Sequence, residues 1–247
     1  EQYERTESSV ATLPNFRFET GMACALGSTL QFSPEGTAEF VPEIHEIWEA
    51  VHDEEALVIA LYLRTGQTDE MASHELRIKQ GEDAGDAPVD SSDIFGLHAK
   101  AVRCAEQVES DWLSRPIHRN TKKRSVWMVA SDSQHLCSKV VEQYGDKKVD
   151  VGDRTSVTRK VLTTGAKGRQ TRTARSPLTE DFAEALADWW LLGESDVVVN
   201  HSMLSFGQTA AMRTARPIYR ASHKGDCSRM VLPLMEVDGE TFPSYKV

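Results

Sequence analysis

Residues 188–211 read DWWLLGESDVVVNHSMLSFGQTAA, and this stretch decides the fold. A helical pattern ends with the two tryptophans, the short run DVVV (196–199) follows at once, and a second helical pattern begins at Ser205. A helix, a buried strand and a second helix in direct succession are typical of a parallel sheet covered on both faces. Small polar residues follow the strand, starting with Asn200 and His201, and this is where open α/β sheets bind ligands.

The same alternation extends along the rest of the chain. The runs LVIALYL and SVWMVA are short and nearly continuous in apolar residues, as in strands that are buried on both faces. We therefore predict a Rossmann-like α/β fold, with a parallel sheet and helices on both of its faces. The predicted strands are 57–63, 125–130, 147–151, 196–199 and 215–221, and the predicted helices are 40–51, 97–113, 131–145, 176–190 and 205–214.

The helix that begins at Ser176 has a predicted apolar face and a predicted acidic face. Asp188 falls on the side of Asp181 and Glu184, so a solvated acid is one alternative for Asp188. The predicted apolar face consists of Phe182, Leu186, Trp189 and Trp190.

The length and composition bound the class of protein. A chain of 247 residues forms one large domain or two small ones. We expect residues 41–247 to form the Rossmann-like domain and residues 1–40 to be the remnant of a larger domain. The net charge of −10 argues against nucleic acid as a partner. No apolar run reaches the roughly 20 residues that span a bilayer, and residues 1–30 lack the pattern of a signal peptide.

Charge is distributed unevenly along the chain. Residues 67–93 carry eight acids against Arg77 and Lys79, whereas residues 154–175 carry seven basic residues and no acid. Solvated loops explain both runs most simply. A weaker hypothesis is that the basic stretch closes over a bound phosphate.

The cysteines leave the redox compartment open. Cys24, Cys104, Cys137 and Cys227 are dispersed, and no C-x-x-C pair marks a zinc or thioredoxin site. Two disulfides and four buried thiols both fit this spacing. Cys104 and Cys137 fall on apolar helix faces, where buried thiols are common.

The familiar chemical motifs are absent, and three strand ends remain as candidates. The sequence has no glycine-rich phosphate motif, no H-E-x-x-H, no G-x-S-x-G and no D-x-D. Arg64 follows strand 57–63, Asp132 lies in the group that follows 125–130 and Asn200 follows 196–199, so a parallel sheet would bring all three to one edge. An arginine beside helix N-termini forms an anion site. An ordinary salt bridge for Arg64 and helix capping for Asp132 are the alternatives.

The sequence resembles the fucosyltransferase superfamily, which includes plant xyloglucan, α1,6- and protein O-fucosyltransferases. The resemblance covers about residues 20–220 and lies in the stretches FVPEIHEIWEAV, LVIALYLRTGQTDE, SVWMVASDSQHL and ALADWWLLGESDVVVNHSMLSFGQTAAM. It implies a GT-B fold of two Rossmann-like halves, with this chain as the half that binds GDP-fucose. It also implies transfer of fucose to a glycan or protein hydroxyl in the Golgi lumen, without a metal or other cofactor.

The resemblance also implies roles for single residues. Arg64 matches the arginine that contacts the β-phosphate of GDP, so it is the expected catalytic residue. Asp132 and Asp188 match acids expected on the nucleoside side of the donor. A guanidinium and helix-start amides would stabilise the charge that grows as fucose departs. The start of the last helix matches a Ser-Phe-Gly element at Ser205, Phe206 and Gly207.

Two departures from the family pattern support an alternative. Tyr62 stands where the family has histidine, and Gln67 stands where it has an acid. The alternative is a non-catalytic structural or assembly subunit with a degenerate donor site and other protein chains as partners. A nucleotide-binding regulator without transfer is a third hypothesis. We expect the glycosylation sequon at residues 200–202 to be unused, because it sits at a predicted strand end near the ligand.

Overall fold

The computed structural model describes residues 31–64, 91–119, 121–150, 156–166, 179–201, 205–221 and 227–230. Within these residues one mixed sheet of seven strands has the order β3-β4-β2-β1-β5-β6-β7. The strands are β1 (Ala56–Leu63), β2 (Arg124–Ser131), β3 (Lys147–Asp150), β4 (Ser156–Leu162), β5 (Val197–Asn200), β6 (Ile218–Ala221) and β7 (Cys227–Arg229). The helices are α3 (Pro34–Thr37), α4 (Ile44–Val51), α6 (Ser91–Ser114), α7 (Pro116–Arg119), α8 (Gln134–Tyr144), α9 (Thr179–Glu194) and α10 (Ser205–Arg213).

The sheet confirms the predicted α/β class. Strands β4, β2, β1, β5 and β6 are parallel, and β3 and β7 pair antiparallel at the two edges. Counted along the chain, the parallel strands have the order 3-2-1-4-5, as in a Rossmann fold. The expectation that residues 147–151 form a parallel strand is wrong. The chain from β3 to β4 is far shorter than the dozen or so residues that a parallel crossover needs.

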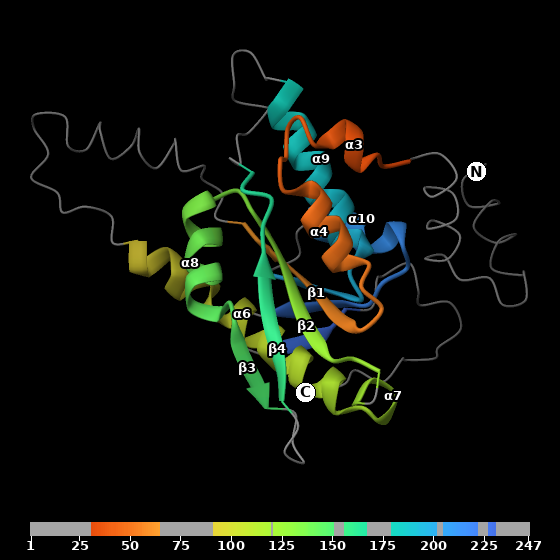
Figure 1. Cartoon of the computed structure of the whole chain (residues 1–247). Helices are drawn as coiled ribbons and strands as arrows, with labels where there is room; N and C mark the ends of the chain where they lie inside the picture. The colour runs from red at the N-terminus through yellow and green to blue at the C-terminus, as the bar shows by residue number, and fades with distance from the viewer. Residues whose placement is uncertain are drawn as a thin grey trace, which may run out of the picture.

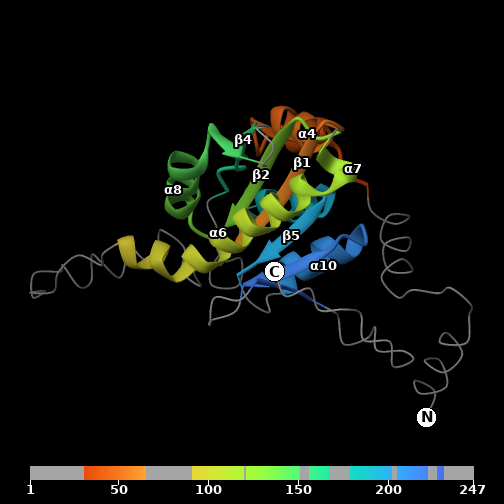
Figure 2. The same cartoon turned by 90° about the horizontal axis from the view of Figure 1, so that it is seen from below.

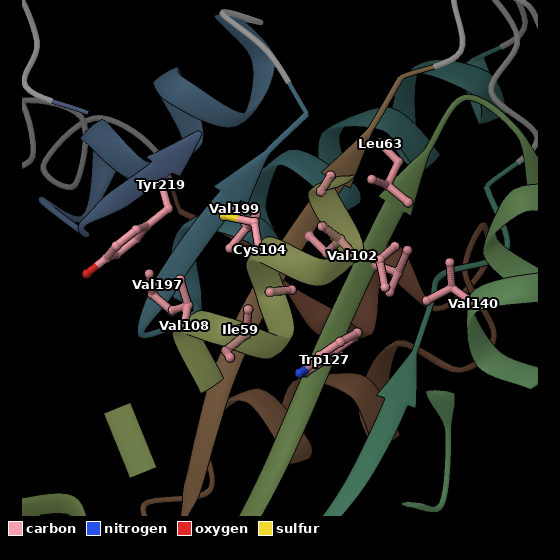
Figure 3. Close-up of a cluster of buried hydrophobic side chains, with 14 of the residues drawn as sticks. Ile59, Leu63, Val102, Cys104, Val108, Trp127, Val140, Val197, Val199 and Tyr219 are labelled. Carbon is pink, nitrogen blue, oxygen red and sulfur yellow. The ribbon is translucent and has the colours of Figure 1, made fainter. Parts of the chain in front are cut away.

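Strand β1 lies in the middle of the sheet and is buried along its whole length, as its apolar sequence predicts. Its alternate residues pack on opposite faces. Ile59 and Leu63 pack with helices α6 and α8, whereas Ala60 and Tyr62 pack on the side of α9 and α10 (Figure 1, Figure 2). Figure 3 shows side chains of the α6 face, with Val102 of the helix gathered among those of the sheet.

Strand β4 corrects the interpretation of the basic stretch 154–175 as a loop. Its residues alternate between buried and exposed, with Arg159 facing the α6 side and Lys160 facing α4. Arg159 binds the buried carboxylate of Glu109, and Lys160 Nζ lies 2.6 Å from Glu46 Oε1. Neither residue therefore fits a phosphate-covering role. The other basic residues of the stretch lie outside the described residues: Arg154, Lys167, Arg169, Arg172 and Arg175.

The cysteines combine both expected states. A disulfide joins Cys104 of α6 to Cys227 of β7, across 123 residues of sequence. The interpretation of Cys104 as a buried thiol is therefore wrong, because its partner lies on an edge strand that the sequence did not predict. Cys137 on α8 is a buried thiol, and Cys24 lies outside the described residues.

The first described residues pack on the α4–α9 face. The ring of Phe32 stacks on Trp48 and Trp190, with centroid distances of 5.3 and 5.5 Å. The division of the chain at residue 40 stays a prediction. Helix α6 begins before the predicted residue 97, and residues 67–90 of the acidic stretch lie outside the described part of the chain. Among the described helices, none is long and apolar enough to cross a membrane.

Candidate functional site

The predicted strand ends meet at one edge of the sheet, which we call the carboxyl edge. Leu63 pairs with Ser131 and Tyr62 pairs with Asn200, so β1, β2 and β5 end side by side. Strands β1 and β5 are neighbours from the two halves of the 3-2-1-4-5 order, and this makes their junction the topological switch point of the sheet. Open α/β sheets bind ligands in the crevice at this point.

Arg64 follows β1 at the switch point. Its Nε lies 4.0 Å from Asp132 Oδ2, and 42% of its side chain is exposed. The charge of Arg64 acts on the Tyr62 hydroxyl, so the two side chains lie in the same region. Burial raises the pKa of Tyr62 above its usual value, and Arg64 opposes this shift. The guanidinium is thus paired with Asp132 while part of its surface stays open to a ligand.

Asp132 lies with Arg64 and directly precedes the N-cap of the following helix. Ser133 is the N-cap of α8, because its Oγ accepts the N–H of Leu136 at 3.2 Å. The N-cap of α8 is therefore Ser133, and a capping contribution from Asp132 stays a prediction. The geometry brings Asp132 to the residue expected at the phosphate, whereas the resemblance implied a position on the nucleoside side.

The start of α10 lies beside the end of β1. Phe206 stacks on the ring of Tyr62 with a centroid distance of 5.0 Å. Gly207 follows, and a Cβ at this position would collide with Asn200 Oδ1, so glycine allows α10 to approach β5 closely. Ser205 is the first residue of the helix. The first N–H groups of a helix have no partner within it and favour anions.

Asp188 of α9 points into the protein. It is 5% exposed, and Thr164 Oγ1 donates a hydrogen bond of 2.5 Å to its Oδ1. Burial raises the pKa of Asp188 to about 7, the charge of Glu184 adds to the shift, and the Thr164 hydroxyl opposes it. The alternative of a solvated acid is therefore wrong. The charge of Asp188 also acts on Tyr62, so the two side chains lie in the same region.

The predicted apolar and acidic faces of α9 are also wrong in part. Phe182 and Leu186 are 62% and 43% exposed, whereas Asp181 and Glu184 are buried with Asp188. Trp190 is buried as predicted. Three acids at helical spacing suggested a solvated face, but α9 turns Asp188 toward Thr164, two residues after the end of β4. Sequence reasoning missed Thr164 because it treated residues 152–175 as a loop.

A histidine pair lies on the other face of the carboxyl edge. The rings of His98 and His201 meet edge to face with a centroid distance of 4.1 Å. Burial lowers the pKa of His98 to about 4, and His201 lowers it further. Within the described residues His98 Nδ1 has no hydrogen-bond partner. The sequence gave no signal for this pair, because 103 residues separate its members.

The described part of the chain contains no group of three or more histidine, cysteine or acidic residues that could hold a metal ion. The polar groups that gather at the switch point are a guanidinium, two carboxyl groups, two hydroxyls and the N-terminus of α10. This set suits an anionic ligand with further hydrogen-bonding groups.

No protein-family model matches the sequence, and no curated protein matches it. The structure is similar to that of an Arabidopsis thaliana FUT1 mutant in complex with GDP, with a TM-score of 0.39 and 13% sequence identity. The match covers 78% of this chain and 35% of that one, so this chain spans about a third of the length of that protein. A similarity this weak carries no argument about function. The functional argument rests on the residues of the carboxyl edge.

Proposed function

We propose that this chain binds GDP-fucose at the carboxyl edge and transfers fucose to a hydroxyl of a glycan or a protein. It would act as the donor-binding half of a GT-B glycosyltransferase. The observation that carries the proposal is the position of Arg64 at the switch point, directly after a strand whose Tyr62 stacks on Phe206 in the first turn of α10. A diphosphate is the ligand that these two positive groups favour together.

The proposed chemistry uses charge stabilisation by this chain's own groups. The fucose–oxygen bond of the donor breaks, GDP leaves, and negative charge grows on its β-phosphate. Arg64 and the amides at Ser205, Phe206 and Gly207 would stabilise this charge more strongly in the transition state than in the bound donor. Asp188 is the proposed contact on the nucleoside side, and Asp132 holds Arg64 in place.

We also propose that the protein works in the Golgi lumen, with a glycan or protein acceptor as its partner. The disulfide between Cys104 and Cys227 supports this proposal, because disulfides persist in the oxidising compartments of the secretory pathway and are rare in the cytosol.

Calorimetric titration with GDP and GDP-fucose, in the presence of a chelator, tests donor binding. We expect the wild-type protein to bind both ligands and Arg64→Ala to lose roughly 2 kcal/mol of binding free energy, or about 30-fold in affinity. Arg124→Ala is the matched control, because Arg124 is a half-exposed arginine at the opposite end of β2 that also pairs with acids. It should bind GDP as the wild type does.

Two outcomes would contradict the proposal. The first is the absence of binding at millimolar ligand, and the second is an equal loss of affinity in Arg64→Ala and Arg124→Ala. Release of GDP from GDP-fucose, measured with candidate acceptors, then tests transfer. Binding without release by any acceptor would favour a regulator over an enzyme.

A structural or assembly subunit is the second candidate. The exposed side chains of Phe182 and Leu186, one helical turn apart on α9, favour it, because a partner chain would bury them. This candidate predicts that a complex with the partner chain forms normally with Arg64→Ala. It also predicts that the complex does not form with a variant that carries both Phe182→Ser and Leu186→Ser.

A further inference from the structure

We propose that Arg220 and Gln208 form a subsite on the β6 side of α10, and that this subsite binds the sugar of the donor. This inference rests on the proposed function and extends the candidate site beyond the switch point. Its basis is a pair of buried donor atoms, Arg220 Nε and Gln208 Nε2. Within the described residues neither atom has a hydrogen-bond partner.

Arg220 lies at the carboxyl edge and on the same face of the sheet as α10. It pairs with Asn200, the last residue of β5, and Asn200 in turn pairs with Tyr62 of β1. The residues before it in β6 show which way it faces. Ile218 packs in the cluster that contains residues of α10, whereas Tyr219 packs in the cluster that contains α6. Side chains alternate along a strand, so Arg220 faces α10.

Gln208 lies on the flank of α10 that faces β6. Gly207 of this helix faces β5, since a Cβ there would collide with Asn200 Oδ1. Phe206, one residue earlier, stacks on Tyr62 of β1. Successive residues of a helix are about 100° apart, so Gln208 falls on the opposite flank from Phe206. That flank is the one toward β6, because β5 lies between β1 and β6.

The chemistry of the two side chains suits a sugar. Buried donors are nearly always hydrogen-bonded, and one without a partner costs free energy that a ligand oxygen would recover. Arg220 and Gln208 are each partly exposed as whole residues, so a ligand meets them from the surface. A guanidinium donates only, whereas an amide both donates and accepts, and together they match the hydroxyl groups of a sugar.

The order of the strands assigns this subsite to the sugar end of the donor. The strands end along the carboxyl edge in the order β4, β2, β1, β5 and β6. Asp188, the proposed contact of the nucleoside, binds Thr164 just after β4. Arg64, the proposed contact of the β-phosphate, follows β1. Arg220 lies two strands further on, about 10 Å from β1. A donor that runs along the edge in this direction therefore brings its sugar to Arg220.

The test compares the binding of GDP and GDP-fucose, which differ only by the sugar. Arg220→Met and Gln208→Met remove the donor groups and keep the approximate length of each side chain. Arg216→Met is the matched control, because Arg216 is an exposed arginine that lies before the opposite end of β6. Thermal unfolding confirms that all three variants are folded before the comparison.

Calorimetry should show a loss of affinity for one ligand only. We expect Arg220→Met and Gln208→Met to bind GDP as the wild type does and to lose about tenfold in affinity for GDP-fucose. Arg216→Met should bind both ligands normally. In the wild type, the Nε–Hε resonance of Arg220 should shift on titration with GDP-fucose and stay in place with GDP.

Each result decides the inference. Equal losses for GDP and GDP-fucose in Arg220→Met would overturn it, because Arg220 would then contact the diphosphate. An unchanged affinity for GDP-fucose in either Arg220→Met or Gln208→Met would also overturn it, and so would an Arg220 resonance that GDP-fucose does not shift. In these cases GDP still binds and the proposed donor site stands. A wild type that binds neither ligand would overturn the subsite and the proposed function together.

Discussion

The two ends of the sheet differ in how their buried carboxyl groups are balanced. Near the amino end, Glu109 of α6 is fully buried and accepts hydrogen bonds from Ser125 Oγ at 2.5 Å and Trp127 Nε1 at 3.0 Å. Arg159 adds a two-pronged ion pair to the same carboxylate. At the carboxyl edge, Asp188 is buried with a hydroxyl donor, Thr164, and another acid, Glu184, whose charge raises the pKa of Asp188.

This difference distinguishes a cluster that supports the fold from a candidate binding site. The Glu109 cluster joins α6 to β2 and β4, and its charges are balanced within the fold. The carboxyl edge holds titratable groups whose pKa values are shifted by burial, and such groups concentrate at functional sites. Proteins leave buried polar and charged groups without balancing partners mainly at functional sites. We therefore expect substitutions at the amino end to change stability and substitutions at the carboxyl edge to change the proposed ligand binding.

Breaking the Glu109 cluster should have the largest effect on stability. Glu109→Ala leaves the Arg159 guanidinium buried without its carboxylate, and we expect it to lower the free energy of unfolding by about 3 to 5 kcal/mol. Glu46→Ala is the control, because it breaks the exposed pair with Lys160 and should lower it by less than about 1 kcal/mol. Urea titrations measure both values. Equal losses in the two variants would mean that the buried cluster does not stabilise the fold.

Asp188→Asn should change how stability depends on pH. The unfolded carboxyl loses its proton near pH 3.8, whereas the folded one keeps it up to about pH 7. The wild type therefore loses stability as the pH rises from about 4 to 7, and the variant does not. We expect the difference between Asp188→Asn and wild type to grow in favour of the variant by on the order of 4 kcal/mol between pH 4 and pH 8.

Urea titrations at several pH values measure this difference. Asp111→Asn changes a half-exposed acid that pairs with Arg115 on the surface, and it provides the control. A constant difference between Asp188→Asn and wild type across this pH range would show that the burial of Asp188 carries no electrostatic penalty.

His98→Gln should change the pH dependence of stability by a smaller amount and in the opposite direction to Asp188→Asn. The unfolded imidazole takes up a proton below about pH 6.5, whereas folded His98 stays neutral down to about pH 4, because burial lowers its pKa. Wild-type stability therefore falls as the pH drops through this window, and the variant should lose about 2 kcal/mol less between pH 7 and pH 4.5. Replacing the exposed His45 with Gln is the control. The same pH slope in all three proteins would contradict the assignment.

The sequence predicted the central elements because their patterns are local. The apolar run of β1, the helical spacing in α4 and α8, and the alternation of strands and helices all follow from neighbouring residues. Strand β4 was missed because its inward residues include Arg159, and an arginine becomes buried only when a distant partner, Glu109, balances it. The antiparallel β7 was missed for a similar reason, since it is tied to α6 through Cys227.

Part of the candidate site was predictable for a geometric reason. Parallel strands end at one edge, so Arg64, Asp132 and Asn200 had to gather once their strands were found. Thr164 could not be predicted without β4. The buried orientation of Asp188 could not be predicted either. The helical pattern of α9 places Phe182 and Leu186 on its apolar face, but these two side chains are exposed and Asp188 is buried.

The most direct test of the account is an amide chemical-shift map of the protein titrated with GDP. The account predicts shifts at Arg64, Asp132 and Phe206, on both sides of the switch point, and none at Ser125 or Arg159 near the amino end. Shifts centred on the amino end, or no shifts at millimolar GDP, would contradict the claim that the carboxyl edge of this sheet is a nucleotide site.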